Sequence, residues 1–110
     1  VEREIRRGNH YDAIIMDPPS YGRGTKGEIW KIEDCVYPLI KLCAKLLSDD
    51  PLFFLISSYT TGLQPAVLNN MLTMTVARTR SGKVVADEIV LPVTAGGVLP
   101  CGASGRWEGK

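Results

Sequence analysis

The sequence lacks any long apolar run. None of its hydrophobic segments approaches the ~20 residues that a membrane-spanning helix needs. Its first residues also lack the basic, apolar and small-residue pattern of a signal peptide. We therefore predict a cytoplasmic protein without a membrane partner. The chain has 110 residues, of which 45% are hydrophobic, and this length suits one compact domain at most.

Cysteine and surplus charge are also scarce. The three cysteines, Cys35, Cys43 and Cys101, are odd in number and show no C-x-x-C spacing, so neither a disulfide framework nor a metal site is predicted. The formal net charge is +1, whereas strong nonspecific binding to nucleic acid needs a clustered basic surface. Any contact with RNA must therefore be local. The alternating charges of residues 2–7 are typical of a solvated helix that ends at Gly8.

What the sequence does contain is an acid, two prolines and an aromatic residue directly after an apolar strand. The strand is predicted at residues 11–16, and it is followed by Asp17, Pro18, Pro19, Ser20 and Tyr21. The prolines have no N–H, so nearby carbonyl groups can accept hydrogen bonds from a planar amino group. The acid adds a charged acceptor, and the tyrosine ring can stack on a base. A flipped nucleobase fits these groups, and a simple proline-stiffened turn is the alternative.

A glycine-rich segment follows. Residues 22–27 match the pattern G-x-G-x-x-G, but a dinucleotide-binding loop needs its glycines at the strand-to-helix turn, and here two prolines intervene. We interpret the segment as a mobile lid over Asp17, in which Arg23 and Lys26 would meet a nucleic-acid phosphate. A loop that is merely flexible is the alternative.

The next segments predict a parallel crossover. Residues 33–47 have the apolar periodicity of an amphipathic helix, and residues 52–56 form a continuous apolar run that predicts a strand buried on both faces, like residues 11–16. Because a strand, a helix and a strand in this order are parallel, we expect Ser57 and Ser58 to emerge at the same sheet edge as Asp17.

The remaining segments predict one more helix and a hairpin. The helix is expected at residues 64–74. Residues 84–91 and 98–99 flank a glycine-containing turn, which predicts a β-hairpin. Trp107, beyond the hairpin, is expected to pack as a lid.

Three segments carry a resemblance to a known family: YDAIIMDPPSYGRGTKGEIWKIED, LCAKLLSDDPLFFLISSYTTGL and LPVTAGGVLPCGASGRWE. They resemble the C-terminal half of class I S-adenosylmethionine-dependent methyltransferases, in the group of ribosomal-RNA large-subunit methyltransferase relatives. The resemblance implies an α/β fold: a partial Rossmann-like methyltransferase sheet with the fourth to seventh strands, in which parallel strands and helices precede a C-terminal antiparallel hairpin. Residues 1–110 would be the C-terminal part of a single methyltransferase domain, without its N-terminal cofactor-binding half.

The resemblance also implies an activity, namely methylation of a nucleobase in RNA, and of rRNA in particular, with S-adenosylmethionine as cofactor. The residues expected to be catalytic are Asp17, Pro18, Pro19 and Tyr21. Cofactor contact is expected from Asp17 and Pro18. Substrate contact is expected from Ser20, Arg23, Lys26, Ser57 and Ser58.

Ser57 and Ser58 indicate which kind of atom receives the methyl group. Members of the resembled group that methylate cytosine carbon have a cysteine nucleophile where this chain has Ser57 and Ser58. A hydroxyl without an activating base does not replace a thiolate. Transfer to an amino nitrogen or to another atom held by Asp17 therefore fits better.

The absent half has two implications. In the resembled family it contains the glycine-rich loop and the acid that hold the cofactor, so we expect the isolated chain to be inactive. The strand from Tyr11 to Met16 would also lose a neighbour, and the exposed edge predicts a homodimer. The alternative to an enzyme is a non-catalytic folded remnant or a dimerising interaction module that lacks the cofactor site.

Overall fold

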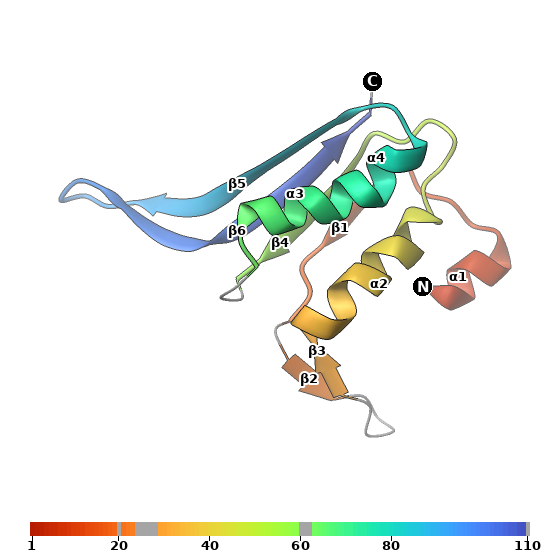
Figure 1. Ribbon diagram of the computed structural model, residues 1–110, viewed down its shortest axis with the longest axis horizontal. Helices are drawn as coiled ribbons and strands as arrows, with labels where there is room; N and C mark the ends of the chain where they lie inside the picture. The colour runs from red at the N-terminus through yellow and green to blue at the C-terminus, as the bar shows by residue number, and fades with distance from the viewer. Residues whose placement is uncertain (20, 24–28, 60–62, 110) are drawn as a thin grey trace.

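The chain folds into a mixed α/β structure with a four-stranded sheet (Figure 1). The computed structural model describes residues 1–19, 21–23, 29–59 and 63–109. The helices are α1 (Glu2–Arg7), α2 (Ile32–Ala44), α3 (Pro65–Met74) and α4 (Val76–Thr79). The strands are β1 (Ala13–Met16), β2 (Tyr21–Arg23), β3 (Ile29–Lys31), β4 (Phe53–Ser58), β5 (Lys83–Pro92) and β6 (Val98–Glu108).

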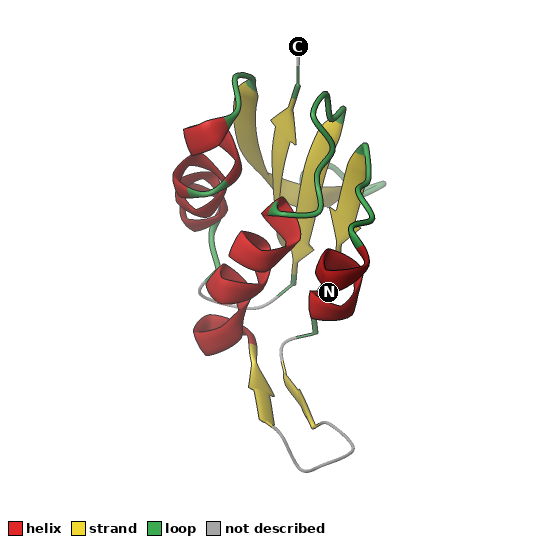
Figure 2. Ribbon diagram, turned by 90° about the vertical axis from the view of Figure 1, so that its right-hand side faces the viewer, coloured by secondary structure: helices red, strands yellow, loops and turns green. Residues whose placement is uncertain are grey.

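The strand order β1-β4-β6-β5 confirms the predicted fold class. β1 and β4 are parallel neighbours, and Met16 lies opposite Ile56. The last strand, β6, is antiparallel to both of its neighbours and lies between β4 and β5. Figure 2 shows the four strands side by side, with the helices in front of them. The sheet therefore combines one parallel crossover with a C-terminal antiparallel hairpin.

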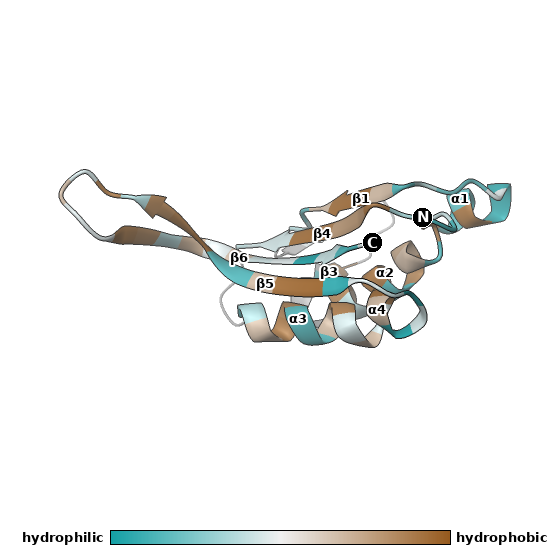
Figure 3. Cartoon of the chain, turned by 90° about the horizontal axis from the view of Figure 1, so that it is seen from above, coloured by the Kyte–Doolittle hydropathy of each residue, from teal (hydrophilic) through white to brown (hydrophobic). Residues whose placement is uncertain are grey.

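In the part of the chain that the structure describes, helices cover one face of this sheet and leave the other uncovered. Figure 3 shows α2, α3 and α4 on the same side, and the side chains of β4 alternate between buried and half-buried along the strand. Ile15 of β1, on the opposite face, is 70% exposed. The prediction that both apolar strands are buried on two faces is thus wrong. A short apolar run in the sequence does not show whether other elements cover one face of the strand or both.

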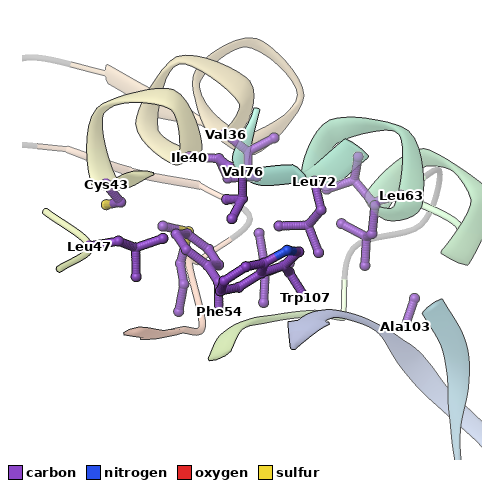
Figure 4. Packing of buried hydrophobic residues seen from close by; sticks show 13 residues of the cluster. Val36, Ile40, Cys43, Leu47, Phe54, Leu63, Leu72, Val76, Ala103 and Trp107 are labelled. Atoms are coloured by element: carbon purple, nitrogen blue, oxygen red, sulfur yellow. The ribbon is translucent and has the colours of Figure 1, made fainter. Parts of the chain in front are cut away.

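The buried face forms a continuous hydrophobic core. At its centre Phe54 of β4 lies opposite Trp107 of β6, and both are covered by the helices (Figure 4). Trp107 is only 1% exposed, so the prediction that it forms a lid is wrong. β6 continues past Trp107 to Glu108. Trp107 lies on the same face of this strand as the buried Ala103 and Gly105.

The segment after β1 also differs from the predicted loop. β2 and β3 pair as a short antiparallel ladder in which Gly22 lies opposite Trp30. β3 leads directly into α2, which begins at Ile32 and has no side-chain cap. Pro38 therefore lies in the second turn of α2, where its ring removes one backbone hydrogen bond of the helix.

The short helix α1 is fastened to the start of β1. It ends at Gly8 in a left-handed conformation, as predicted. The Tyr11 hydroxyl donates a hydrogen bond of 2.5 Å to the Glu4 carboxylate. This bond, together with those from Asn9 and Arg7, lowers the pKa of Glu4, and the same carboxylate raises the pKa of Tyr11. The contact joins α1 to the residues just before β1.

Gly82 provides a test of how tightly the core packs against β6. Its φ is +154°, and a Cβ at this position would overlap the carbonyl oxygen of Glu108 and lie 2.6 Å from Nε1 of Trp107. We expect Gly82→Ala to lower the free energy of unfolding in urea by about 1–3 kcal/mol, because the buried indole cannot move without disturbing the core.

The matched control is Gly22→Ala, whose Cβ would have no atom within 4 Å. We expect this variant to stay within ~0.5 kcal/mol of the original protein. Equal stability of the two variants would contradict the packing described for Trp107.

Candidate functional site at the end of the parallel strands

The carboxyl ends of β1 and β4 meet at one edge of the sheet. Because Met16 lies opposite Ile56, Asp17 and Ser57 follow at the same level. This confirms the expected meeting of the two strand ends. Asp17 is exposed, Pro18 is buried, and Pro19 is exposed. In open α/β sheets, ligands bind at the carboxyl ends of the strands.

A hollow of about 400 Å³ opens beside Asp17. Its walls come from the end of β1, from α2 and from the first residue of the chain. The lining residues are Val1, Ile15, Met16, Asp17, Pro18, Pro19, Leu39 and Cys43. Apolar walls with a single charged side chain suit a flat, largely apolar group that carries one polar edge.

The Asp17 carboxylate is available to bind the polar edge of such a ligand. Among the described residues, none donates a hydrogen bond to it or forms an ion pair with it. A free carboxylate accepts hydrogen bonds at both oxygens, so it can orient an amino group that enters the hollow. Pro18 and Pro19 line the same hollow, and a proline has no N–H group.

Four of the predicted site residues fall on the segment after Pro19. The backbones of Tyr21 and Arg23 are placed in β2, opposite Lys31 and Ile29, and their side chains lie outside the described part of the chain, as do Ser20 and Lys26 entirely. The predicted lid also falls mainly on residues 24–28, outside the described part. The roles of these residues stay predictions.

The two serines lie within β4, whereas they were expected to follow it. Ser58 is 1% exposed and lies opposite Ala103. Ser57 is half-buried on the uncovered face, opposite Ser104. The structure thus brings Ser57 to the same edge as Asp17, but neither serine lines the hollow. Their roles as substrate contacts also stay predictions.

Two lining residues of α2 were not anticipated from the sequence. Leu39 and Cys43 are four residues apart and therefore share one helix face. The sequence shows this shared face, but only the packing of α2 beside β1 shows that it reaches Asp17. Burial raises the pKa of the Cys43 thiol. A protonated thiol acts here as a small apolar wall and not as a nucleophile.

Neither a membrane segment nor a metal centre appears in what the structure describes. Its helices are too short or too polar to cross a bilayer. The residues at 1–19, 21–23, 29–59 and 63–109 include no group of three or more histidine, cysteine, aspartate or glutamate side chains that could hold a metal ion.

Solved structures of methyltransferases share this fold. The chain is similar to a SAM-dependent methyltransferase from Agrobacterium tumefaciens, with 31% identity and a TM-score of 0.89 over 99% of this chain and 36% of that one. It is also similar to SMU.776, a protein assigned as a methyltransferase and solved with SAH, at 18% identity and a TM-score of 0.69, covering 97% of this chain and 28% of that one. A third likeness, to M1.HpyAVI in complex with SAM, has 14% identity and a TM-score of 0.55, covering 99% and 49%.

These likenesses define the fold as methyltransferase-like. No protein-family model matches the sequence, and no curated protein matches it significantly. The chain spans 36%, 28% and 49% of the three similar chains, and thus less than half of each. The described fold therefore matches part of the fold of the SAM-dependent methyltransferase from Agrobacterium.

The alkylation rate of the Cys43 thiol tests whether α2 packs against the sheet as described. Cys43 is buried, whereas Cys35 and Cys101 are partly exposed. We expect iodoacetamide to modify Cys43 about tenfold or more slowly than Cys101 at mildly alkaline pH, because the Cys43 thiol is both covered and harder to ionise. Peptide mass spectrometry over time measures each rate in the same sample. Equal rates at Cys43 and Cys101 would show that α2 does not pack beside β1 as described.

Proposed function

We propose that this chain is the acceptor-orienting part of an S-adenosylmethionine-dependent methyltransferase that modifies a nucleobase in RNA, and in rRNA in particular. The observation that carries the proposal is the unpaired Asp17 carboxylate beside an apolar hollow, at the carboxyl end of a strand in a methyltransferase-like sheet. The methyltransferase class is supported by the structural likenesses, and the RNA substrate is supported by the sequence resemblance.

In this proposal the residues after β1 hold the acceptor. Asp17 accepts a hydrogen bond from the amino group that receives the methyl group, Pro18 presents its carbonyl group to the same amino group, and Pro19 stiffens the turn beside them. Tyr21 stacks on the base. Because methyl transfer needs the acceptor in line with the methyl donor, positioning supplies most of the catalysis. Asp17 also stabilises the positive charge that develops on the amino nitrogen before its proton leaves.

The remaining predicted contacts concern the substrate strand. Arg23 and Lys26 would neutralise phosphates near the flipped base, and Ser20 and Ser57 would donate hydrogen bonds to the substrate strand. A chain with a formal net charge of +1 has no general surplus of positive charge for RNA. Recognition in this proposal is therefore concentrated at the site.

The hollow fits only part of the cofactor. S-adenosylmethionine supplies an electrophilic methyl group, and it carries an adenine, a ribose and an amino acid that need separate partners. The apolar walls and the adjacent Asp17 and Pro18 suit the region around the methyl group. Among the described lining residues, Asp17 has the only charged side chain, so the proposal places the partners of the ribose and the amino acid outside these residues.

Cofactor affinity of the isolated chain is the first measurement. We expect calorimetric titration with S-adenosylhomocysteine to show no saturable binding below roughly millimolar concentration, because the chain matches only 36% of the Agrobacterium enzyme. Circular dichroism shows in the same sample whether the chain is folded. Nanomolar binding would contradict the expectation and would mean that the chain, alone or as an oligomer, forms a complete cofactor site.

Activity is tested by placing this chain in the Agrobacterium enzyme, in exchange for the segment that it matches. We expect the chimera to methylate RNA, and Asp17→Ala to lower the transfer rate at saturating cofactor at least about a hundredfold. Asp17→Asn keeps one acceptor oxygen, so its loss should be smaller. The matched control is Asp49→Ala, which removes an exposed aspartate before the start of β4.

Transfer at an unchanged rate in the Asp17→Ala chimera would overturn the role given to Asp17. A folded chimera that binds S-adenosylhomocysteine but methylates no RNA would overturn the RNA substrate. A chimera that folds but neither binds the cofactor nor transfers methyl would favour the alternative of a non-catalytic module.

A further inference from the structure

Positive charge gathers in a groove between α2 and α4. The two helices lie beside each other (Figures 1 and 3), and the groove has a volume of about 380 Å³. The described residues that line it include no acid and four cations: Lys41, Lys45, Arg78 and Arg80. All of the lining residues lie between positions 37 and 80, away from both ends of the chain. The cluster therefore depends on the helices that the structure describes.

The spacing of residues along α2 forms one side of this groove. Tyr37, Lys41 and Lys45 follow one another at intervals of four residues and share one face of the helix. Leu39 and Cys43 are each two positions further along, which is about 200° around the helix axis, and they line the hollow beside Asp17. The groove and the hollow thus lie on different sides of α2.

Arg80 joins the two sides of the groove. Its guanidinium donates a hydrogen bond of 3.2 Å to the Leu47 carbonyl, so the segment after α4 is tied to the turn after α2. Arg80 is half-buried, whereas Lys41, Lys45 and Arg78 are exposed. One cation therefore holds the groove together, and three are accessible to a ligand.

The four cations of the groove are not neutralised by neighbouring acids. Elsewhere in the described chain, Arg7 and Arg106 each form an ion pair with a glutamate. Within the described residues, the groove cations form no such pair. Asp49 and Asp50 line an adjoining hollow that shares Arg80 with the groove. The positive potential is therefore concentrated at the three exposed cations, and the aspartates limit it at the Arg80 end.

We propose that this groove binds the sugar–phosphate backbone of a single-stranded segment of RNA. Lys41 and Lys45 are one helical turn apart, about 6 Å along the axis, which is close to the separation of neighbouring phosphates in a strand. Tyr37 adds a half-buried aromatic ring beside these cations. A positively charged groove with an aromatic side chain is typical of proteins that bind single strands.

The shape and the charge of the groove favour this ligand over others. Cations spread over two helices contact several phosphates of one strand, whereas a single small anion contacts only part of them. A concave groove surrounds a strand on two sides, whereas the flat surface of a membrane meets only its rim. The formal net charge of the chain is +1, so binding in this proposal depends on the local arrangement of cations and not on the overall charge.

The groove extends the proposed function. It adds an RNA contact outside the candidate site, and the choice of RNA as the nucleic acid rests on the proposed function. The two roles are separable, because the groove binds phosphates by charge and Asp17 orients a base. RNA that contacts both would pass over α2.

The test is the affinity for a short fluorescein-labelled oligouridine, measured by fluorescence anisotropy at several salt concentrations. The groove variant combines Lys41→Gln, Lys45→Gln and Arg78→Gln, which remove charge and keep a long polar side chain. We expect it to raise the dissociation constant about tenfold or more at low salt. The slope of log Kd against log salt should fall by about two, because each phosphate contact with a single strand contributes about 0.7.

The matched control combines Arg3→Gln, Arg6→Gln and Lys83→Gln. It removes the same number of exposed positive charges outside the groove. We expect its dissociation constant to stay within about threefold of wild type, because distant exposed charges are screened by salt. Both variants are also compared in the chimera with the Agrobacterium enzyme, where the remaining part of a methyltransferase is present.

Several results would overturn the proposal. Wild-type chain that does not bind oligouridine, or binds it independently of salt, has no phosphate groove. Equal losses in the two variants would show that only the overall charge attracts RNA, and equal affinities in the chimera would show that other residues cover the groove. Tighter binding of oligoglutamate would assign the groove to an acidic polypeptide, and displacement of the RNA by an equal concentration of inorganic phosphate would assign it to a single anion.

Circular dichroism confirms that each variant is folded. Binding of oligouridine is measured without cofactor, so a failure of this proposal is distinct from a failure of the proposed function. The cofactor titration and the Asp17→Ala chimera decide the latter separately.

Discussion

Parallel pairing of β1 with β4 is the constraint on which the rest of the structure depends. Parallel neighbours need a long connection, and α2 is the helix that makes this crossing. The same pairing brings the carboxyl ends of both strands to one edge, so that Asp17 lies at the level of Ser57. β6 occupies the other side of β4. The position of the site thus follows from the pairing of β1 with β4.

The hydrophobic core lies on the face of the sheet that the helices cover. Phe54 and Trp107 lie opposite each other on neighbouring strands beneath the helices, and aromatic side chains in such pairs bury large areas. The uncovered face has Leu55 next to Ile15 in the ladder, with Arg106 beyond it. On this face the side chain of Leu55 in β4 is half-buried, and that of Ile15 in β1 is exposed. The chain is therefore well packed where the helices cover β4 and the end of β6.

The sequence allowed the order of the elements to be predicted because each has a strong local pattern. The apolar run before Asp17, the periodic helix with Leu39 and Cys43, and the glycine turn of the hairpin are all local signals. How much of a strand is covered by other elements cannot be read from its local sequence. The 70% exposure of Ile15 and the burial of Trp107 both depend on which elements pack against a strand. The β2–β3 ladder was missed because glycine and charged residues dominate its segment.

The same distinction applies to the site. The acid and the prolines were predicted to mark it because they follow a strand end, and the structure places them beside a hollow. The walls contributed by Leu39 and Cys43 depend on how α2 packs against the sheet, which residue types alone do not reveal. Ser58 was expected to follow the strand because a strand end cannot be located to within two residues from an apolar run. It is buried because β6 extends the ladder to Ala103.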